Sequence, residues 1–478
     1  MTSRTKSRAS ILALAVALVI WAVAPVATLK AETQSLETLL AYLKSPNVST
    51  RKDAARKLGE RRVRNQLAVE ALAVASRKDE DAGVRAAAVE SLGMIKDFSA
   101  LPEMVGALKD NHSDVRRVGV RSLVALYTEH EIDFVTNVRS GWNVLNPFLD
   151  TNDREIIEPY QIVDPSIIRA LGEAARGDRE REVRIAAVRA LGVLRGYRAI
   201  PQLADALNSD QDMRIEVLRA MIKIGDPSAG RHLIPYFTDS NHKVRTQAML
   251  AAGLLKYQLA VEPLLTAYNL GPEKRGAVKK VVGGVKGLFS YLPARDEAAL
   301  WALSLIGDEK AERVFVENMT SKDGDRRQYS FEGLARIGDT RYLDQITRHS
   351  AAEGNSDVRL AQYWALYKMG SRPNIQYVVR KLDTDQRQQA RGYLMEADSP
   401  ADLYPYVRSS STTIRRQVIE ILGRIGDEST IKELEPIART SGAATADTAT
   451  VAIKRIEWRQ AGRPRAADDV LRREYRPR

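Results

Sequence analysis

The sequence predicts an all-α fold, specifically an α-solenoid in which short helix pairs stack side by side. Three observations predict it. An apolar pattern with an arginine near its start recurs at intervals of about 30 residues. Each copy is a helix with two apolar faces, which needs a neighbour on two sides. The chain has no run of alternating β-branched residues and no Asn-Gly hairpin, so strand signals are absent.

The clearest copy of this unit is Val183–Gly196. Steps of four, three and four residues place one apolar stripe on a single helix face, formed by Val183, Ala187, Ala190 and Leu194. A second stripe consists of Ile185, Val188 and Gly192. A lone helix of this length is marginal in water, so the unit requires stacking partners. Its small residues, Gly192 among them, allow those partners to approach closely.

The partners are further copies of the same unit. Their opening residue pairs are Thr50–Arg51, Val84–Arg85, Val115–Arg116, Met213–Arg214, Val244–Arg245, Arg295–Asp296, Arg326–Arg327, Val358–Arg359, Gln386–Arg387 and Ile414–Arg415. The spacing is 28 to 34 residues except for two gaps of 68 and 51 residues. The sequence therefore predicts about eleven helix pairs with two insertions.

The turn inside each pair has its own signal. A Gly-Asp dipeptide recurs after the first helix, at Gly225-Asp226, Gly307-Asp308, Gly338-Asp339 and Gly426-Asp427. Glycine accommodates the left-handed conformation that ends a helix, and the aspartate that follows is a good N-cap for the next helix. We therefore expect the first helix to end at the glycine and the second to begin after the aspartate.

Taken together, these motifs resemble the HEAT-like repeats of the phycobilisome-lyase type. The pattern is clearest at Asp114-Val115-Arg116, at Asp357-Val358-Arg359 and at Gly423–Asp427, and the resemblance extends over roughly residues 36–459. It implies an α-solenoid. Because this family includes scaffolds, lyases and hydroxylases, the resemblance implies a fold rather than one activity.

The N-terminus differs from the rest of the chain. Arg4, Lys6 and Arg8 precede an uncharged, mostly apolar run at residues 9–29. This pattern is typical of a secretory signal peptide, and an uncleaved membrane anchor is the alternative because the run is long enough to span a bilayer. We assign residues 1–31 to this leader. In both cases the solenoid is expected to be exported, to the periplasm or the outer face of the membrane.

Composition limits the chemistry. The chain has no cysteine, which excludes disulfides, Cys-ligated zinc and a thiol nucleophile. The formal net charge of +12 favours anionic partners. Many arginines recur with the fold's period, each near an acidic residue of the preceding turn, as in Asp114/Arg116, Glu182/Arg184, Asp212/Arg214 and Asp357/Arg359. We interpret them as an inter-repeat ladder of ion pairs.

The expected organisation has HEAT-like repeats at residues 32–127, 165–270 and 294–460, separated by insertions at 128–164 and 271–293 and followed by a charged tail at 461–478. The first insertion is acidic and contains several aromatic residues. It is either functional or packed on a repeat edge. The second is basic, amphipathic and rich in glycine. It either lies on an anionic membrane or forms an additional solenoid helix.

The candidate binding residues lie on late second helices. Three residue pairs occur at matching distances in sequence from the turn that precedes each second helix: Gln345 with Arg348, Tyr377 with Arg380, and Tyr404 with Arg408. Second helices usually line the concave face in proteins with this repeat. A row of tyrosine and arginine there would suit protein recognition, because both dominate interface hot spots. Packing between repeats is the alternative interpretation.

No catalytic motif is evident. The five histidines have no metal-ligand spacing, and no phosphate-binding loop occurs. We therefore expect no cofactor, no metal and no enzymatic activity. The predicted function is an exported scaffold that binds a protein partner, with an acidic partner favoured by the net charge, or an envelope polymer. The alternatives are a component of a lyase and a binder of polyanions such as nucleic acid or anionic lipid, with nucleic acid the less favoured.

Overall fold

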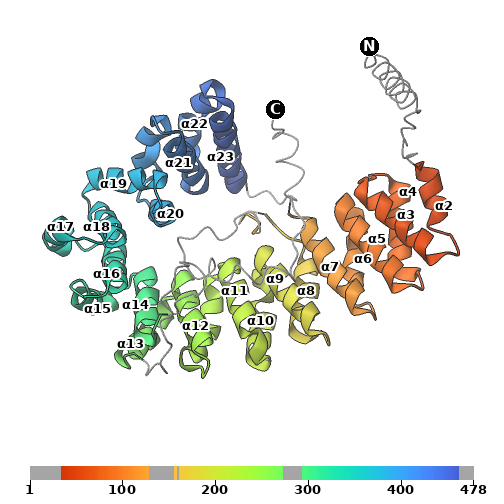
Figure 1. Cartoon of the computed structure of the whole chain (residues 1–478), viewed down its shortest axis with the longest axis horizontal. Helices are drawn as coiled ribbons and strands as arrows, with labels where there is room; N and C mark the ends of the chain where they lie inside the picture. The colour runs from red at the N-terminus through yellow and green to blue at the C-terminus, as the bar shows by residue number, and fades with distance from the viewer. Residues whose placement is uncertain (1–33, 129–155, 159–160, 273–292, 462–478) are drawn as a thin grey trace, which may run out of the picture.

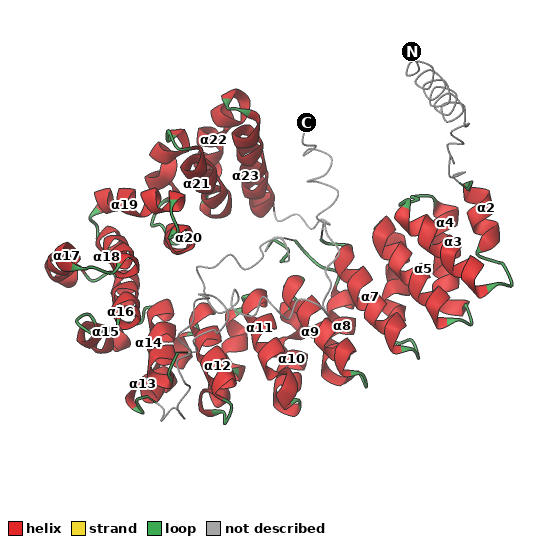
Figure 2. Ribbon diagram, in the orientation of Figure 1, coloured by secondary structure: helices red, strands yellow, loops and turns green. Residues whose placement is uncertain are grey.

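A computed structural model describes residues 34–128, 156–158, 161–272 and 293–461, and these residues form a curved stack of antiparallel helix pairs with no strand among them (Figures 1 and 2). The all-α solenoid is confirmed. The expected leader, most of both insertions and nearly all of the tail lie outside the described residues. No helix within the described ranges combines the length and apolar character needed to cross a membrane.

The first helices of the pairs begin where the recurring pattern predicts. Within the described residues they are α3 (Val48–Glu60), α5 (Ala82–Ile95), α7 (Ser113–Ala125), α9 (Arg181–Val193), α11 (Arg214–Ile224), α12 (His242–Leu254), α14 (Arg295–Ile306), α16 (Gly324–Ile337), α18 (Ser356–Lys368), α20 (Arg387–Leu394) and α21 (Thr412–Ile425). In α9 both predicted stripes face the core, and only Ile185 stays partly exposed.

The second helices are shorter and less regular. They are α4 (Gln66–Lys78), α6 (Leu101–Ala107), α8 (Pro165–Gly177), α10 (Ile200–Ser209), the 3-10 helices η6 (Pro227–His232) and η7 (Ile234–Thr238), α13 (Val261–Asn269), α15 (Glu312–Asn318), α17 (Leu343–Ala352), α19 (Ile375–Arg380), the 3-10 helix η13 (Pro400–Arg408) and α22 (Glu428–Thr440). Helix α2 (Leu36–Tyr42) precedes the first pair, and α23 (Ala443–Ala461) follows the last.

The Gly-Asp turns behave as predicted, with one exception. Gly225, Gly307 and Gly338 have φ of 71°, 70° and 74° and end their helices in the left-handed conformation. Gly426 is extended instead, with φ −68° and ψ 166°. The aspartate that follows each of the four glycines caps the next helix through its side chain. Gly426 differs because the next residue, Asp427, is already the N-cap of α22 and forms a capping box there.

Small residues set the curvature of the stack. A Cβ placed on Gly192 of α9 would lie 3.1 Å from Cα of Ala220 in α11, so these first helices approach almost backbone to backbone. Similar close approaches join further first helices, at Gly59 to Ser91, Gly93 to Ser122, Gly253 to Ala302 and Gly423 to Ala452. Because first helices pack more tightly than second helices, they follow the shorter arc. Figure 1 accordingly shows α14, α16 and α18 on the inner side and α13, α15 and α17 outside.

Contacts between residues distant in sequence also cross the inner side. Ile157, at the end of the first insertion, donates its N–H to Val193 O at 3.0 Å and accepts from Arg195 Nε at 2.9 Å. The next residue, Glu158, forms an ion pair of 3.1 Å with Arg455 of α23. Ile157 is therefore held by the end of α9, and Glu158 by the last helix.

Candidate binding surface

The ion-pair ladder runs along the edge where each second helix connects to the next first helix. Arg85 shows the pattern: its Nε and Nη2 donate to Asp110 at 2.7 and 2.9 Å, and its Nη1 donates to Asp79 O at 3.0 Å. One guanidinium thus fixes its own loop and the next one. Equivalent ion pairs are Arg51–Asp79, Arg116–Asp178, Arg184–Asp210, Arg214–Asp239 and Arg327–Glu353. The inter-repeat ladder is confirmed.

The acidic partners are not the residues expected from the sequence. Asp114 pairs with Arg117 one helical turn away, and Asp357 accepts from Gln386 Nε2. The physical reason is the direction in which each arginine side chain extends. The acid two residues before each ladder arginine lies on the exposed first turn of its own helix, whereas the arginine reaches across to the end of the following second helix.

Pairing lowers the pKa of three ladder acids. Burial is the largest single influence on Asp79 and Asp110 and raises their pKa values. The hydrogen bonds from Arg51 and Arg85, a backbone N–H and the nearby positive charges together outweigh it, so both pKa values lie below the ordinary range. For Glu353 the hydrogen bond from Arg327 is the largest influence and lowers the pKa. These carboxylates stay charged in the folded protein at neutral pH, and the ladder is ionic.

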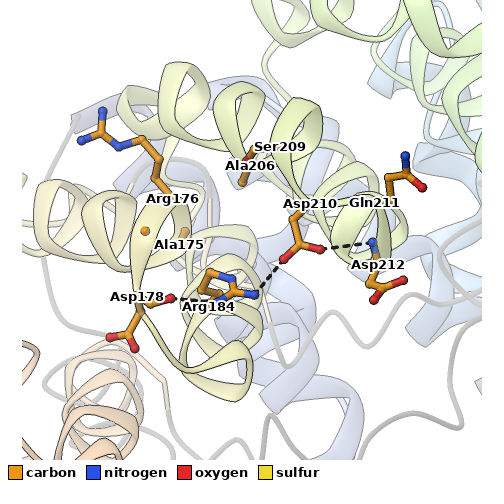
Figure 3. A pocket seen from close by; sticks show the side chains of 10 residues that line it. Ala175, Arg176, Asp178, Arg184, Ala206, Ser209, Asp210, Gln211 and Asp212 are labelled. Atoms are coloured by element: carbon orange, nitrogen blue, oxygen red, sulfur yellow. Dashed lines mark hydrogen bonds and ion pairs between the residues drawn. The ribbon is translucent and has the colours of Figure 1, made fainter.

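One groove opens on this edge between the ends of α8 and α10 (Figure 3). It has a volume of about 530 Å³ and contains a ladder step, Arg184 to Asp210 at 2.9 Å. Arg184 also donates to Asp178 O at 2.8 Å, and Asp210 accepts from the N–H of Asp212 at 3.2 Å. Of the charged side chains drawn in Figure 3, Arg184 and Asp210 pair with each other. Arg176 and Asp178 pair with Asp205 and Arg116, which are not drawn. Among the described residues, no group of three or more His, Asp or Glu side chains is placed to hold a metal ion.

A buried polar cluster lies between α16, α18 and α20. Tyr393 donates its hydroxyl to Glu332 at 2.6 Å, and Gln328 Nε2 donates to the same carboxyl oxygen at 2.8 Å. The ring of Tyr393 stacks on Trp364 with centroids 4.4 Å apart and planes inclined by 5°. Burial raises the pKa of Glu332 and raises that of Tyr393 well above its ordinary value. Because Glu332 is 0% exposed, this arrangement joins repeats and offers no acid to solvent.

A buried arginine of α16 extends this cluster to a fourth unit, that of α14. Arg336 forms two hydrogen bonds of 3.0 Å with Glu396, which is 60 residues away in sequence. It also donates to Ser304 O at 2.8 Å and lies 4.9 Å from the ring centre of Trp364. Burial raises the pKa of Glu396, yet the adjacent Arg336 brings it below the ordinary value.

Local motifs did not predict this cluster. Trp301, Glu332 and Trp364 each stand five residues after the second position of their unit, where Val183–Gly196 has Arg189. Most other units also have arginine or glutamate at this position, whereas tryptophan occurs there in these two units alone. The signal in the sequence is therefore the pair of tryptophans on either side of a glutamate at one position of three consecutive units.

The predicted Tyr/Arg row lies on α17, α19 and η13. Arg348, Arg380 and Arg408 are all exposed, whereas Gln345 and the two tyrosines are half-buried. The structure does not bring these residues into one compact site, because each pair belongs to a different unit.

The half-buried tyrosines of the row make contacts within the array. Tyr377 stacks on Tyr363 at 3.9 Å between ring centres. The hydroxyl of Tyr404 lies 2.9 Å from Ser429 Oγ and 3.0 Å from Thr430 Oγ1, at the start of α22. Arg408 lies 3.8 Å from Glu433. Both tyrosines thus contribute to packing, and each leaves an arginine beside it in solvent.

The expected side of the array is wrong for this row. Figure 1 places α17 on the outer side, with α18 between it and the interior. The close approaches between first helices require this arrangement, since the more tightly packed helices must follow the inner arc. If the row binds a partner, the partner contacts the outer surface.

The fold and the ladder together define the class of protein: a regular α-solenoid built from two-helix repeats. The family model for HEAT repeats matches residues 26–135 and 168–253. Within those two ranges the chain therefore has HEAT-like repeats. No curated protein matches its sequence.

Solved structures with similar helical arrays include three complexes or receptors. The complex of CpcE and CpcF of phycocyanin lyase from Nostoc is 17% identical, with 70% of this chain and 95% of that chain covered and a TM-score of 0.28. Importin beta is 12% identical, with 91% and 63% covered and a TM-score of 0.43. The Kap95:Nup1 complex is 12% identical, with 94% and 65% covered and a TM-score of 0.45. None of these similarities assigns a partner or an activity to this chain.

Proposed function

We propose that this protein is an exported, non-catalytic scaffold that binds a protein partner through the outer surface of its C-terminal repeats. A HEAT-repeat solenoid is an architecture suited to protein binding. The observation that supports this surface is the row of exposed arginines Arg348, Arg380 and Arg408, repeated on successive second helices. Their guanidinium groups recognise carboxylates, so the partner is an acidic protein.

The aromatic residues beside these arginines strengthen the proposal. The stacked pair of Tyr363 and Tyr377 is held rigidly, with planes inclined by 13°, and Lys381 lies 5.1 Å from the ring centre of Tyr377. A fixed aromatic platform flanked by cations loses little conformational entropy on binding. Interfaces are enriched in this combination of tyrosine and arginine.

The test begins with co-purification of the full-length protein from native envelope extract, followed by mass spectrometry to identify an acidic partner. The affinity of the purified partner is then measured by calorimetry for the variant Arg348→Ala/Arg380→Ala/Arg408→Ala. We expect a loss of about 1 kcal/mol or more per arginine, or at least a hundredfold in total.

The matched control is the variant Arg181→Ala/Lys243→Ala/Lys322→Ala, which removes the same charge from exposed positions at or just before the start of first helices. It should bind the partner like the parent protein. Equal losses in both variants would show that net charge, and not the row, governs binding. Unchanged affinity in the row variant would remove the proposed surface.

Export is a separate part of the proposal and has its own test. Its support is the basic start and apolar run of residues 1–31, which lie outside the described residues. Cell fractionation with mass spectrometry of the N-terminus should find the protein in the envelope. Recovery of the full-length chain in the cytosolic fraction would contradict export and leave the binding surface to be judged by its own experiment.

A further inference from the structure

The N-terminal unit is much more basic than the rest of the chain. Residues 34–78 contain ten lysines and arginines against four aspartates and glutamates, a net charge of +6 out of +12 for the whole protein. The unit thus carries half of the net charge in about a tenth of the sequence. A terminal repeat needs a polar outer face, but either sign of charge would serve that purpose. The excess of positive charge in this unit therefore requires another explanation.

Part of this charge is neutralised within the repeats. Arg51 pairs with Asp79, Arg77 with Glu103, and Lys57 with Asp53. The remaining exposed cations of α3 and the turn after it form what we call the N-terminal basic patch: Lys52, Arg56, Arg61, Arg62 and Arg64. Lys52 and Arg56 are four residues apart and share one helix face, and the other three follow directly after the helix. The exposed acids of this segment are Glu60 and Asp53, and Asp53 pairs with Lys57.

The patch lies where the leader joins the folded array. Gln34 is the first described residue. Arg61 Nη1 donates to its carbonyl oxygen at 2.6 Å, and Lys57 Nζ donates to its side-chain oxygen at 3.3 Å. The apolar run at residues 9–29 therefore ends five residues before a point held by the patch. Leu67, which is 61% exposed, stands three residues after Arg64.

We infer that the N-terminal basic patch seats the first repeat on a membrane surface made of anionic phospholipids. Cations beside a membrane-directed segment are attracted to anionic headgroups, and an exposed leucine among them can enter the interfacial region. The surface lies at the opposite end of the array from the Tyr/Arg row, so it is independent of the proposed partner site. Such an array would rest on the membrane by its first unit and present its last units away from it.

The test measures partition of the full-length protein onto vesicles of phosphatidylcholine with and without 30% phosphatidylglycerol (about a third of the lipid, as in an anionic membrane). The variant Arg56→Gln/Arg62→Gln/Arg64→Gln should lose about a hundredfold in partition onto the anionic vesicles. All proteins carry the same leader, so they should partition equally onto pure phosphatidylcholine. The charge-preserving variant Arg56→Lys/Arg62→Lys/Arg64→Lys should bind like the parent and shows that the positions tolerate substitution.

Three results would overturn the inference. The first is an equal loss in Arg181→Gln/Lys243→Gln/Lys322→Gln, which removes the same charge elsewhere. The second is unchanged partition in the patch variant. The third is tighter binding of the parent protein to duplex DNA than to anionic vesicles at the same salt concentration. Circular dichroism of each variant verifies that the fold is retained. Because the partner assay uses other residues, its failure and the failure of membrane binding are distinguishable.

Discussion

Replacing Arg116 by alanine tests the ladder where it is most buried. Arg116 is 4% exposed, and its Nε and Nη2 donate to Asp178 at 2.7 and 2.8 Å, while Nη1 donates to Asp110 O at 2.9 Å. The substitution leaves Asp178, whose side chain is 6% exposed, without its counter-charge. Removing one partner of a buried ion pair typically costs about 3–5 kcal/mol, so we expect the free energy of unfolding to fall by that amount.

Urea denaturation with amide hydrogen exchange is the appropriate assay, because repeat arrays can unfold in parts. The variant should lose amide protection first in α7 and α8, because the pair joins α7 to the end of α8. Arg117→Ala is the control: this neighbouring arginine has a side chain 38% exposed and pairs only with Asp114, so its loss should cost less than about 0.5 kcal/mol.

A double variant separates two contributions to the loss of stability: the unpaired buried charge of Asp178 and the lost packing of the Arg116 side chain. Asp178→Asn keeps a side-chain oxygen for the N–H of Glu180, which Asp178 binds at 2.9 Å, but removes the charge. Arg116→Met/Asp178→Asn should therefore recover much of the stability lost in Arg116→Ala. A cost below about 1 kcal/mol for Arg116→Ala, or an equal cost for Arg117→Ala, would refute the reasoning that the ladder joins the repeats.

Further predictions concern packing and pH. Gly253→Ala should destabilise by about 1–3 kcal/mol in thermal unfolding, because its Cβ would lie 2.8 Å from Cα of Ala302, whereas Gly106→Ala, with no atom within 4 Å, should be neutral or slightly stabilising. Leu191→Asp, at a side chain 0% exposed, should cost several kcal/mol (about 3 or more) in urea, and a loss near zero would contradict the assigned face. The folded-state pKa of Asp79 lies below its ordinary 3.8, so the pair stabilises the protein above that pH and the stabilisation is lost as the pH falls through the folded pKa. Melting temperatures should therefore drop steeply below about pH 4, and less steeply in Asp79→Asn.

The repeats were predictable from the sequence because their determinants are local. The apolar steps of Val183–Gly196, the Gly-Asp turns and the pitch of the arginines all act within one unit or between adjacent ones. The exception at Gly426 arises because α22 begins with a capping box directly after it, which a single-turn motif does not distinguish.

Features that depend on tertiary distance were not predictable in the same way. The acids of the ladder lie at the end of the following second helix, so proximity in sequence pointed to the wrong partners. The choice of inner helix depends on backbone approaches such as Gly192 to Ala220. The link between Arg336 and Glu396 spans 60 residues and has no local signature. The Tyr/Arg row remains a prediction about binding, now placed on the outer surface.

The ion pair between Glu158 and Arg455 changes how the array responds to mechanical load. An open solenoid extends like a spring, because each repeat yields by a small rotation and the rotations add. Here Arg455 also links the last helix to Glu158, just before α8, so part of a pull on α23 is carried by this ion pair. A single partly exposed pair contributes about 1 kcal/mol or less, so it resists only a small load before the repeats from α8 to α23 extend as an open array would.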